Sequence, residues 1–121
     1  MNSNADFQIK TSYDLVAQVD ISEDDDESVA VDLGGGVLTG VFLPSTFDGT
    51  GFSLLACDTL EGTYSVVTAA DGTPYAAASV AAGEYVALNT EITKGIRFLK
   101  IKTASAQTTT DTLIKLATRS L

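Results

Sequence analysis

Short apolar segments separated by turn residues constrain the fold of this chain more than any other feature. Turns rich in glycine, proline and aspartate follow one another about every 8–15 residues, and many of the segments between them alternate apolar and polar side chains. No connection is long and helical enough to form the crossover that parallel strands require. We therefore predict an all-β fold, a single antiparallel β-sandwich of about eight or nine strands.

The same pattern places the individual strands. After an alternating stretch over 7–10, we expect strands over 15–19, 28–32, 37–43, 52–57, 63–67, 75–80, 84–88, 95–102 and 111–118. Segment 75–80 is rich in alanine, which favours helix, but Pro74 and Gly83 leave room for only about two helical turns, so we interpret it as a strand. The predicted core contains Val41, Leu43, Leu54, Val66, Val86, Phe98, Leu99, Ile101, Ile114 and Leu116.

The residue types that the chain lacks exclude most enzyme chemistry. It has no histidine, no tryptophan and a single cysteine, Cys57. Nucleophiles activated by histidine, histidine-ligated metals, cysteine-ligated zinc or iron–sulfur clusters and an internal disulfide are therefore excluded. We predict a protein without catalytic activity, cofactor or metal, in which Cys57 is a small buried apolar residue rather than a reactive thiol.

Charge is distributed unevenly along the chain. Residues 1–60 contain eleven carboxylates and one cation, a net charge of −10, whereas residues 61–121 have a net charge of +1. Such an acidic surface repels phosphate backbones and anionic lipids, so we expect neither nucleic acid nor membrane as a partner. The first residues lack the basic start and apolar stretch of a signal peptide, which predicts a protein made and folded in a cytoplasm.

Five consecutive acidic residues, Glu23 to Glu27, form the densest group of possible metal ligands. A calcium site needs roughly six to eight oxygens that converge on one point, usually with a glycine that permits the sharp turn. This run has no such glycine, so we interpret it as a solvated loop, with docking to a basic partner surface as the alternative. Three cations on one late strand, Arg97, Lys100 and Lys102, are interpreted as a charged edge or exposed face that discourages aggregation.

The order of turns and apolar segments over residues 36–119 resembles a known group of proteins. The resemblance rests on Leu38-Thr39-Gly40-Val41-Phe42-Leu43-Pro44, Phe47-Asp48-Gly49-Thr50, Phe52-Ser53-Leu54, the turn from Cys57-Asp58 to Tyr64, Asp71-Gly72-Thr73-Pro74-Tyr75, Gly83-Glu84-Tyr85-Val86-Ala87-Leu88, Gly95-Ile96-Arg97-Phe98-Leu99-Lys100-Ile101 and Gln107. These features are similar to those of small structural proteins of tailed phages with jelly-roll-like β-sandwiches. Such proteins occur as capsid decoration (cement) proteins or as virion adaptor and fibre modules.

The resemblance implies one domain with a jelly-roll-like body over 36–121. Residues 1–35 would supply an N-terminal arm, the first strands and the acidic loop. The implied function is that of a phage virion structural protein, a capsid decoration protein that binds the outside of the shell and stabilises it. The alternative is a carbohydrate- or receptor-binding β-sandwich module of a tail or fibre protein, which the lack of tryptophan and the few tyrosines disfavour.

The implied partners are the major capsid protein and two further copies of the chain in a homotrimer on the capsid surface. Within residues 1–12, we expect Phe7 and Ile9 to act as apolar anchors of a docking arm. The alanine-rich segment Ala76–Ala82 is the expected contact between subunits, because small side chains allow close approach and lose little rotamer entropy.

Overall fold

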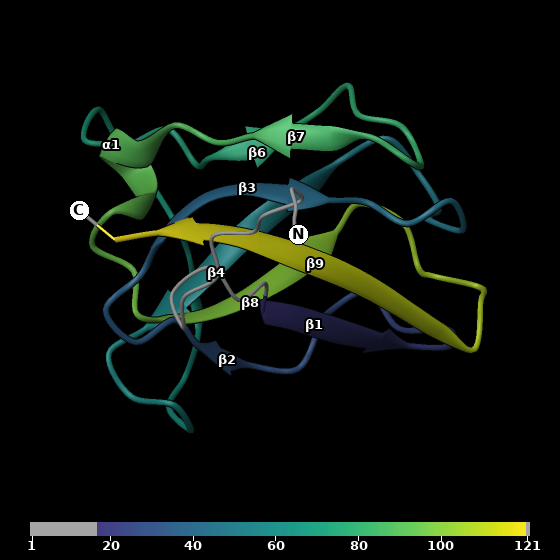
Figure 1. Cartoon of the computed structure of the whole chain (residues 1–121), viewed down its shortest axis with the longest axis horizontal. Helices are drawn as coiled ribbons and strands as arrows, with labels where there is room; N and C mark the ends of the chain where they lie inside the picture. The colour runs from purple at the N-terminus through teal and green to yellow at the C-terminus, as the bar shows by residue number, and fades with distance from the viewer. Residues whose placement is uncertain (1–16, 121) are drawn as a thin grey trace, which may run out of the picture.

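The structure, a computed structural model, describes residues 17–120 of the chain. Within this range it contains nine strands and one short helix (Figure 1): β1 (Ala17–Ser22), β2 (Val31–Asp32), β3 (Val37–Phe42), β4 (Phe52–Cys57), β5 (Ser65–Val66), β6 (Ala76–Ala77), β7 (Tyr85–Ala87), α1 (Thr90–Thr93), β8 (Phe98–Thr103) and β9 (Asp111–Arg119). The alternating stretch over 7–10, with the predicted anchors Phe7 and Ile9, lies outside the described residues. No helix in residues 17–120 is long and apolar enough to cross a membrane.

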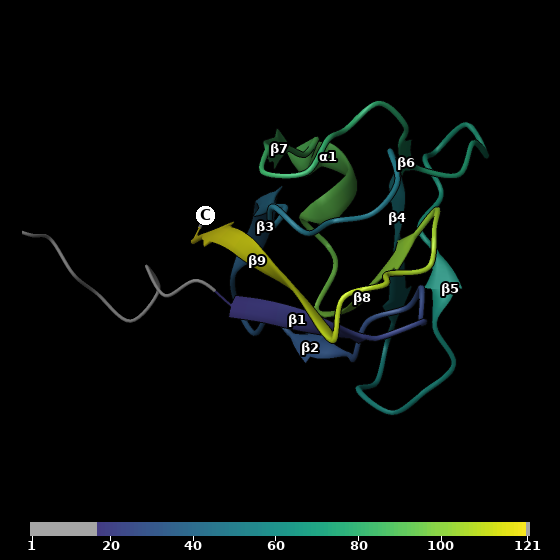
Figure 2. The same cartoon turned by 90° about the vertical axis from the view of Figure 1, so that its right-hand side faces the viewer.

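The strands form two antiparallel sheets that lie as two layers (Figure 2). One sheet has the strand order β1-β9-β3-β7, and the other has the order β2-β8-β4-β5, with β6 also paired to β4. Every ladder between these strands is antiparallel. The prediction of an all-β fold with two antiparallel sheets is therefore confirmed.

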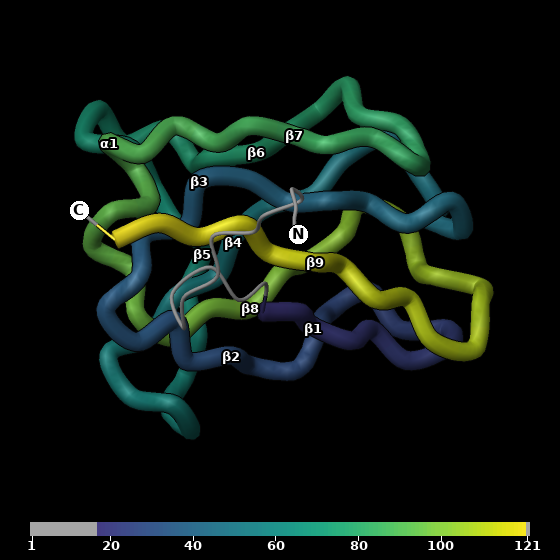
Figure 3. The backbone as a smooth tube through the Cα atoms, in the orientation of Figure 1, coloured from purple at the N-terminus to yellow at the C-terminus, as the bar shows by residue number. Residues whose placement is uncertain are grey.

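Strands from opposite ends of the chain pair with each other. β1 pairs with β9, β2 with β8 and β3 with β7, so that the first and last strands lie side by side (Figure 3). The register of β1 and β9 places Ala17 opposite Leu116 and Ser22 opposite Asp111. Residues 17–32 therefore contribute one strand to each sheet.

The core lies between the sheets and is built from alternate side chains of their strands. On β9, Ile114 and Leu116 are buried, whereas the alternate residues Leu113 and Lys115 face solvent. This is the side-chain period of two that the sequence pattern predicts. Seven predicted core residues are buried: Val41, Leu43, Leu54, Leu99, Ile101, Ile114 and Leu116.

Three other core predictions and the prediction for Cys57 differ from the structure. Val86 and Phe98 are only partly buried. Val66 is exposed, and this prediction is wrong, because its neighbour Val67 packs against the core instead. Cys57 is partly exposed rather than buried, since it ends β4 where the chain leaves the sheet, and its Sγ lies 3.7 Å from an oxygen of Asp58.

Two short elements also depart from the expected strand pattern. The strand expected over 75–80 is limited to Ala76–Ala77. The helix α1 was not expected, and it begins where the side chain of Asn89 accepts a hydrogen bond from the backbone N–H of Glu91, which is the interaction of a helix N-cap. Inside α1, the buried hydroxyl of Thr93 donates to the carbonyl of Leu38, which ties the helix to β3.

Candidate functional site

The outer side of the β1-β9-β3-β7 sheet carries three large exposed apolar side chains. Phe42 on β3 is 44% exposed, Tyr85 on β7 is 48% exposed and Leu113 on β9 is 40% exposed. These strands are adjacent in the order β9-β3-β7 (Figure 1). Side chains on the outer side of adjacent strands are neighbours, so the three belong to one continuous surface. Together with Pro44 and Lys115 they are called the apolar face below.

Strand register brings the members of the apolar face together. Phe42 lies opposite Tyr85 in the β3–β7 ladder and opposite Lys115 in the β3–β9 ladder. The rings of Phe42 and Tyr85 are tilted against each other, with their centroids 4.6 Å apart. Leu113 precedes Lys115 by two residues and therefore faces the same side of β9.

Gly40 allows the ring of Tyr85 to lie flat on the sheet. A Cβ atom at position 40 would lie 2.1 Å from the hydroxyl oxygen of Tyr85 and 2.4 Å from its ring carbon Cζ, closer than real atoms approach. Glycine here makes room for an aromatic side chain from the neighbouring strand. The tyrosine therefore covers the backbone of β3 while half of its own surface stays exposed.

The apolar face contains an open hollow and one cation. The hollow has a volume of about 550 Å³ and is lined by Phe42, Leu43, Pro44, Leu113 and Lys115. Among residues 17–120, the ion pairs involve Lys94, Arg97, Lys100 and Lys102, so Lys115 has no carboxylate partner in this part of the chain. The apolar face thus carries one cation, Lys115, and is bordered by Asp20, which lies opposite Leu113, and by Asp111, which precedes Leu113 by two residues. Such a surface suits a mainly apolar peptide segment.

A second region, on the other sheet, has the opposite character. Residues 26–32 run antiparallel beside β8, and three carboxylates of this segment meet three cations of that strand region. Lys102 Nζ lies 2.9 Å from Asp26 Oδ2, Lys100 Nζ lies 3.1 Å from Glu27 Oε2, and the guanidinium of Arg97 binds both carboxylate oxygens of Asp32 at 2.9 and 3.2 Å. Residues 26–32 with these three cations are called the ion-paired strip below.

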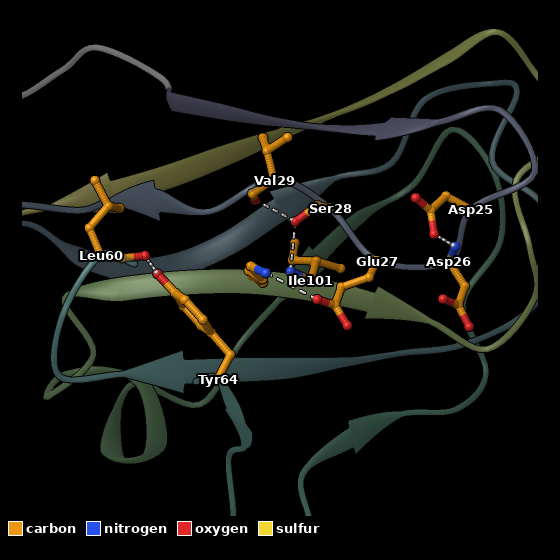
Figure 4. Close-up of polar contacts among 9 residues, drawn as sticks. Asp25, Asp26, Glu27, Ser28, Val29, Leu60, Tyr64 and Ile101 are labelled. Atoms are coloured by element: carbon orange, nitrogen blue, oxygen red, sulfur yellow. Dashed lines mark hydrogen bonds and ion pairs between the residues drawn. The ribbon is translucent and has the colours of Figure 1, made fainter. Parts of the chain in front are cut away.

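Buried hydrogen bonds of Ser28 attach the ion-paired strip to β8 (Figure 4). The Ser28 hydroxyl accepts from the backbone N–H of Ile101 at 2.9 Å and donates to the carbonyl of Val29 at 2.8 Å. The backbone N–H of Ser28 donates to the carbonyl of Ile101 at 2.9 Å. Ser28 is almost fully buried, and its hydroxyl has both a donor and an acceptor. The buried part of the ion-paired strip therefore has its hydrogen bonds satisfied.

The ion pairs shift the pKa values of Asp32 and Lys102. The hydrogen bonds from Arg97 and from the backbone N–H of Gly34 hold the pKa of Asp32 below its ordinary value of 3.8. The hydrogen bond to Asp26 raises the pKa of Lys102 above its ordinary value of 10.5. Both shifts favour the charged forms, so Asp32 and Lys102 stay ionised across the neutral pH range.

Tyr64 extends this region on its outer side. Its hydroxyl donates to the carbonyl of Leu60 at 2.7 Å (Figure 4). The ammonium of Lys100 lies 4.8 Å from the centroid of the Tyr64 ring. Desolvation is the largest cause that raises the pKa of Tyr64. Lys100 is therefore held between Glu27 and an aromatic ring, which leaves it little freedom to bind a partner.

These contacts correct one sequence prediction and decide between the alternatives of another. The acidic run is not a wholly solvated loop, because Asp26 and Glu27 are partly buried and paired with Lys102 and Lys100, while Glu23 to Asp25 are exposed. For the three cations, the edge alternative is wrong, since Lys100 and Lys102 are on β8, which is between β2 and β4 in its sheet, and Arg97 immediately precedes β8. The alternative of an exposed face agrees with their partly exposed side chains. Among residues 17–120, no group of three or more cysteine, aspartate or glutamate side chains could hold a metal ion.

Gln107 links the acidic loop to the neighbouring turn. Its side chain is fully buried, accepts from the backbone N–H of Asp48 at 2.9 Å and donates to the carbonyls of Asp48 and Ser105 at 3.0 Å each. Its backbone bonds to Asp24 and Asp25. Gln107 is therefore a structural residue that anchors three loops.

The sequence analysis did not predict a binding site at the residues of the apolar face. Phe42 stands within a nearly continuous apolar segment, which indicates a core strand on both sides. A weak signal is present in the alternation of Leu113-Ile114-Lys115-Leu116, which places Leu113 on the same side as a charged residue. The sequence does not show that Phe42 and Tyr85 lie beside that position, and Phe7 and Ile9 lie outside the described residues.

Comparisons with protein-family models, with curated proteins and with solved structures find no match to this chain. The function of the apolar face must therefore follow from its own geometry and chemistry.

Proposed function

We propose that this protein is a virion structural protein of tailed phages, a capsid decoration protein that binds the outside of the shell and stabilises it. The observation that carries the proposal is the apolar face. Its three large side chains lie on adjacent strands and are between 40% and 48% exposed, while the opposite side of the same sheet is packed into the core. Apolar side chains gathered on one exposed face are typical of a surface that binds another protein.

The sheet connections support a jelly-roll form of the sandwich. β1 pairs with β9, β2 with β8, β3 with β7, and β4 with β5 and β6. These nested pairs are what one long hairpin would form if it were rolled up into two sheets, which is how a jelly roll is built. Such a rigid body suits a protein whose work is to hold neighbouring subunits together.

The proposed partners are the major capsid protein and other copies of the chain in a homotrimer. Several modest contacts made by one trimer act together, so the assembly binds more tightly than any single contact would. The Phe7 and Ile9 arm remains a predicted part of this docking. The resemblance over residues 36–119 is the second support for the proposal.

Mass spectrometry of purified virions of the phage that encodes the chain, with imaging of labelled particles, tests this proposal. We expect the protein on the shell, and we expect Leu113→Asp to lower its copy number about tenfold or more, because a carboxylate placed in an apolar contact loses its hydration. Val66→Asp is the matched control, since Val66 is equally exposed but lies on β5 of the other sheet. Absence of the protein from virions would contradict the proposal.

The exposed aromatic pair is the observation that favours the second candidate, a carbohydrate-binding module of a tail or fibre protein. Sugars stack on rings such as those of Phe42 and Tyr85. The hollow beside the pair offers one polar side chain, Lys115, for the hydroxyl groups of a sugar. Reproducible binding on a glycan array that is lost in Phe42→Ala would replace the decoration role with this one.

A further inference from the structure

Residues 7–15 have a pattern that matches the apolar face. Every second residue from Phe7 to Leu15 is apolar or threonine, and the residues between them are polar: Phe7, Ile9, Thr11, Tyr13 and Leu15 against Gln8, Lys10, Ser12 and Asp14. An extended chain with this period places one set of side chains on one side and the other set on the opposite side. Such a segment is stable only where its apolar side is covered.

The dimensions of the two surfaces agree. Nine extended residues span about 30 Å, and β9 and β7 lie about 10 Å apart across β3, so the segment can cross the whole apolar face. The open hollow of about 550 Å³ beside Phe42 and Leu113 has room for a large apolar side chain. Phe7, Ile9, Tyr13 and Leu15 are side chains of this kind.

Charge also agrees with this pairing. Lys115 at the edge of the apolar face has no carboxylate partner among residues 17–120. The stretch around residues 7–15 carries Asp6 and Asp14 against the single cation Lys10. In an extended segment Asp14 is on the polar side with Gln8, Lys10 and Ser12, so the carboxylate that can pair with Lys115 is that of Asp6, which precedes the alternating stretch.

The direction of β1 indicates which copy of the chain supplies the segment. Ala17, at the start of β1, lies opposite Leu116, whereas Leu113 is three positions further along the ladder, level with Asp20. A chain that continues straight back from Ala17 leads away from the Leu113 end of its own sheet. Residues 1–16 contain no glycine or proline, and although Ser12 and Asp14 also occur in turns, neither supplies the special backbone freedom of glycine.

We propose that residues 7–15 of one copy bind in extended conformation across the apolar face of a second copy. This inference rests on the proposed function, because it names the partner of the surface that carries it. The exchange is head-to-tail: each copy gives its segment to one neighbour and receives a segment from another. Such a contact closes into a ring, for which the expected homotrimer is one solution, or continues as a polymer.

Cysteine pairing between separately labelled copies tests the exchange. One full-length variant carries Ile9→Cys and the other carries Leu113→Cys, both with Cys57→Ser so that the native thiol cannot react. After mixing and mild oxidation at high protein concentration, we expect a disulfide-linked heterodimer on a non-reducing gel. Moving the first cysteine to positions 7, 8, 10 and 13 is expected to give several-fold higher yields at the odd positions than at the even ones, as the period of two requires.

Ala78→Cys in place of Leu113→Cys is the matched control for the acceptor surface. Ala78 is exposed but lies beyond β6, in the alanine-rich segment that the sequence suggests as the subunit contact. We expect it to give no more than background yield with Ile9→Cys. A yield equal to that of Leu113→Cys would overturn the assignment of the apolar face.

Two other results would also overturn the inference. If the double variant Ile9→Cys/Leu113→Cys forms a disulfide within one chain while the mixed single variants do not, the segment covers its own sheet. If no position in 7–15 reacts with Leu113→Cys in either arrangement, another molecule covers the face. Neither result affects the presence of the protein on virions, which is the separate test of the proposed function.

Discussion

The outer faces of the two sheets satisfy their side chains in different ways. On the β2-β8-β4 side, carboxylates of residues 26–32 meet Arg97, Lys100 and Lys102 within 3.2 Å. On the β9-β3-β7 side, Phe42, Tyr85 and Leu113 remain between 40% and 48% exposed. The charged side chains of the ion-paired strip are paired with one another within the chain. The largest side chains of the apolar face remain exposed to water.

This difference indicates that the ion-paired strip contributes to the stability of the fold, whereas the apolar face is available to bind a partner. Groups that are paired within the chain contribute to folding and gain little from a further partner, whereas exposed apolar groups gain most from one. We therefore expect changes in the ion-paired strip to alter the free energy of unfolding. Changes in the apolar face are expected to alter association more than stability.

The largest effect on stability is expected for Ser28→Ala. This change removes the acceptor of the buried N–H of Ile101, and an unpaired buried donor costs about 1–3 kcal/mol. Urea unfolding followed by circular dichroism measures this loss, with the exposed Ser22→Ala as the control that should change little. Equal stability of the two variants would mean that Ser28 does not hold the strip to β8.

On the apolar face, Gly40→Ala tests the close contact with Tyr85. The new methyl group would displace the tyrosine ring, and we expect a loss of about 1 kcal/mol in the free energy of unfolding, of the order of the strain of overpacking. In a Tyr85→Ala background the same change should be neutral or slightly stabilising, since alanine restricts the unfolded chain more than glycine does. Equal effects in both backgrounds would contradict the contact between Tyr85 and Gly40.

A double-mutant cycle on Glu27 and Lys100 measures the strength of the strip. We expect Glu27→Gln and Lys100→Met to be coupled by about 0.2–1 kcal/mol at low salt, and the coupling should shrink as salt is added. Lys115→Met on the apolar face is the comparison, because Lys115 has no carboxylate partner among residues 17–120. A salt-independent coupling would show that packing, rather than charge, links Glu27 to Lys100.

The smallest effect is expected from the pH dependence of Asp32. Its pKa is lower in the folded chain than its ordinary value of 3.8, so its stabilising contribution is complete above that value and is lost as pH falls through the folded pKa. Asp32→Asn should therefore slightly lower the free energy of unfolding at neutral pH and flatten its loss below about pH 4. Glu61→Gln, in an exposed turn, is the control, and an unchanged acid profile for Asp32→Asn would rule out this role.

Local pattern was sufficient for the fold class and for much of the core. Turn residues and short apolar segments predicted an all-β sandwich, and alternation correctly placed Leu99, Ile101, Ile114 and Leu116 inside it. These features depend on properties that a strand carries in its own sequence. Where neighbouring residues were both apolar, as in Val66-Val67, the pattern could not tell which side chain faces inward, and that prediction failed.

Only the tertiary structure decided which strands are neighbours. The acidic run looks the same in sequence whether it is solvated or paired, and the pairing of Asp26 with Lys102 across 76 positions requires residues 26–32 to run beside β8. Likewise, the predicted core includes Val41 and Leu43 but not Phe42, and only the placement of β7 and β9 beside β3 shows that Tyr85 and Lys115 lie next to Phe42. The period of two determines the two sides of each strand, but strand order determines whether a side is covered, and that order depends on contacts between distant parts of the chain.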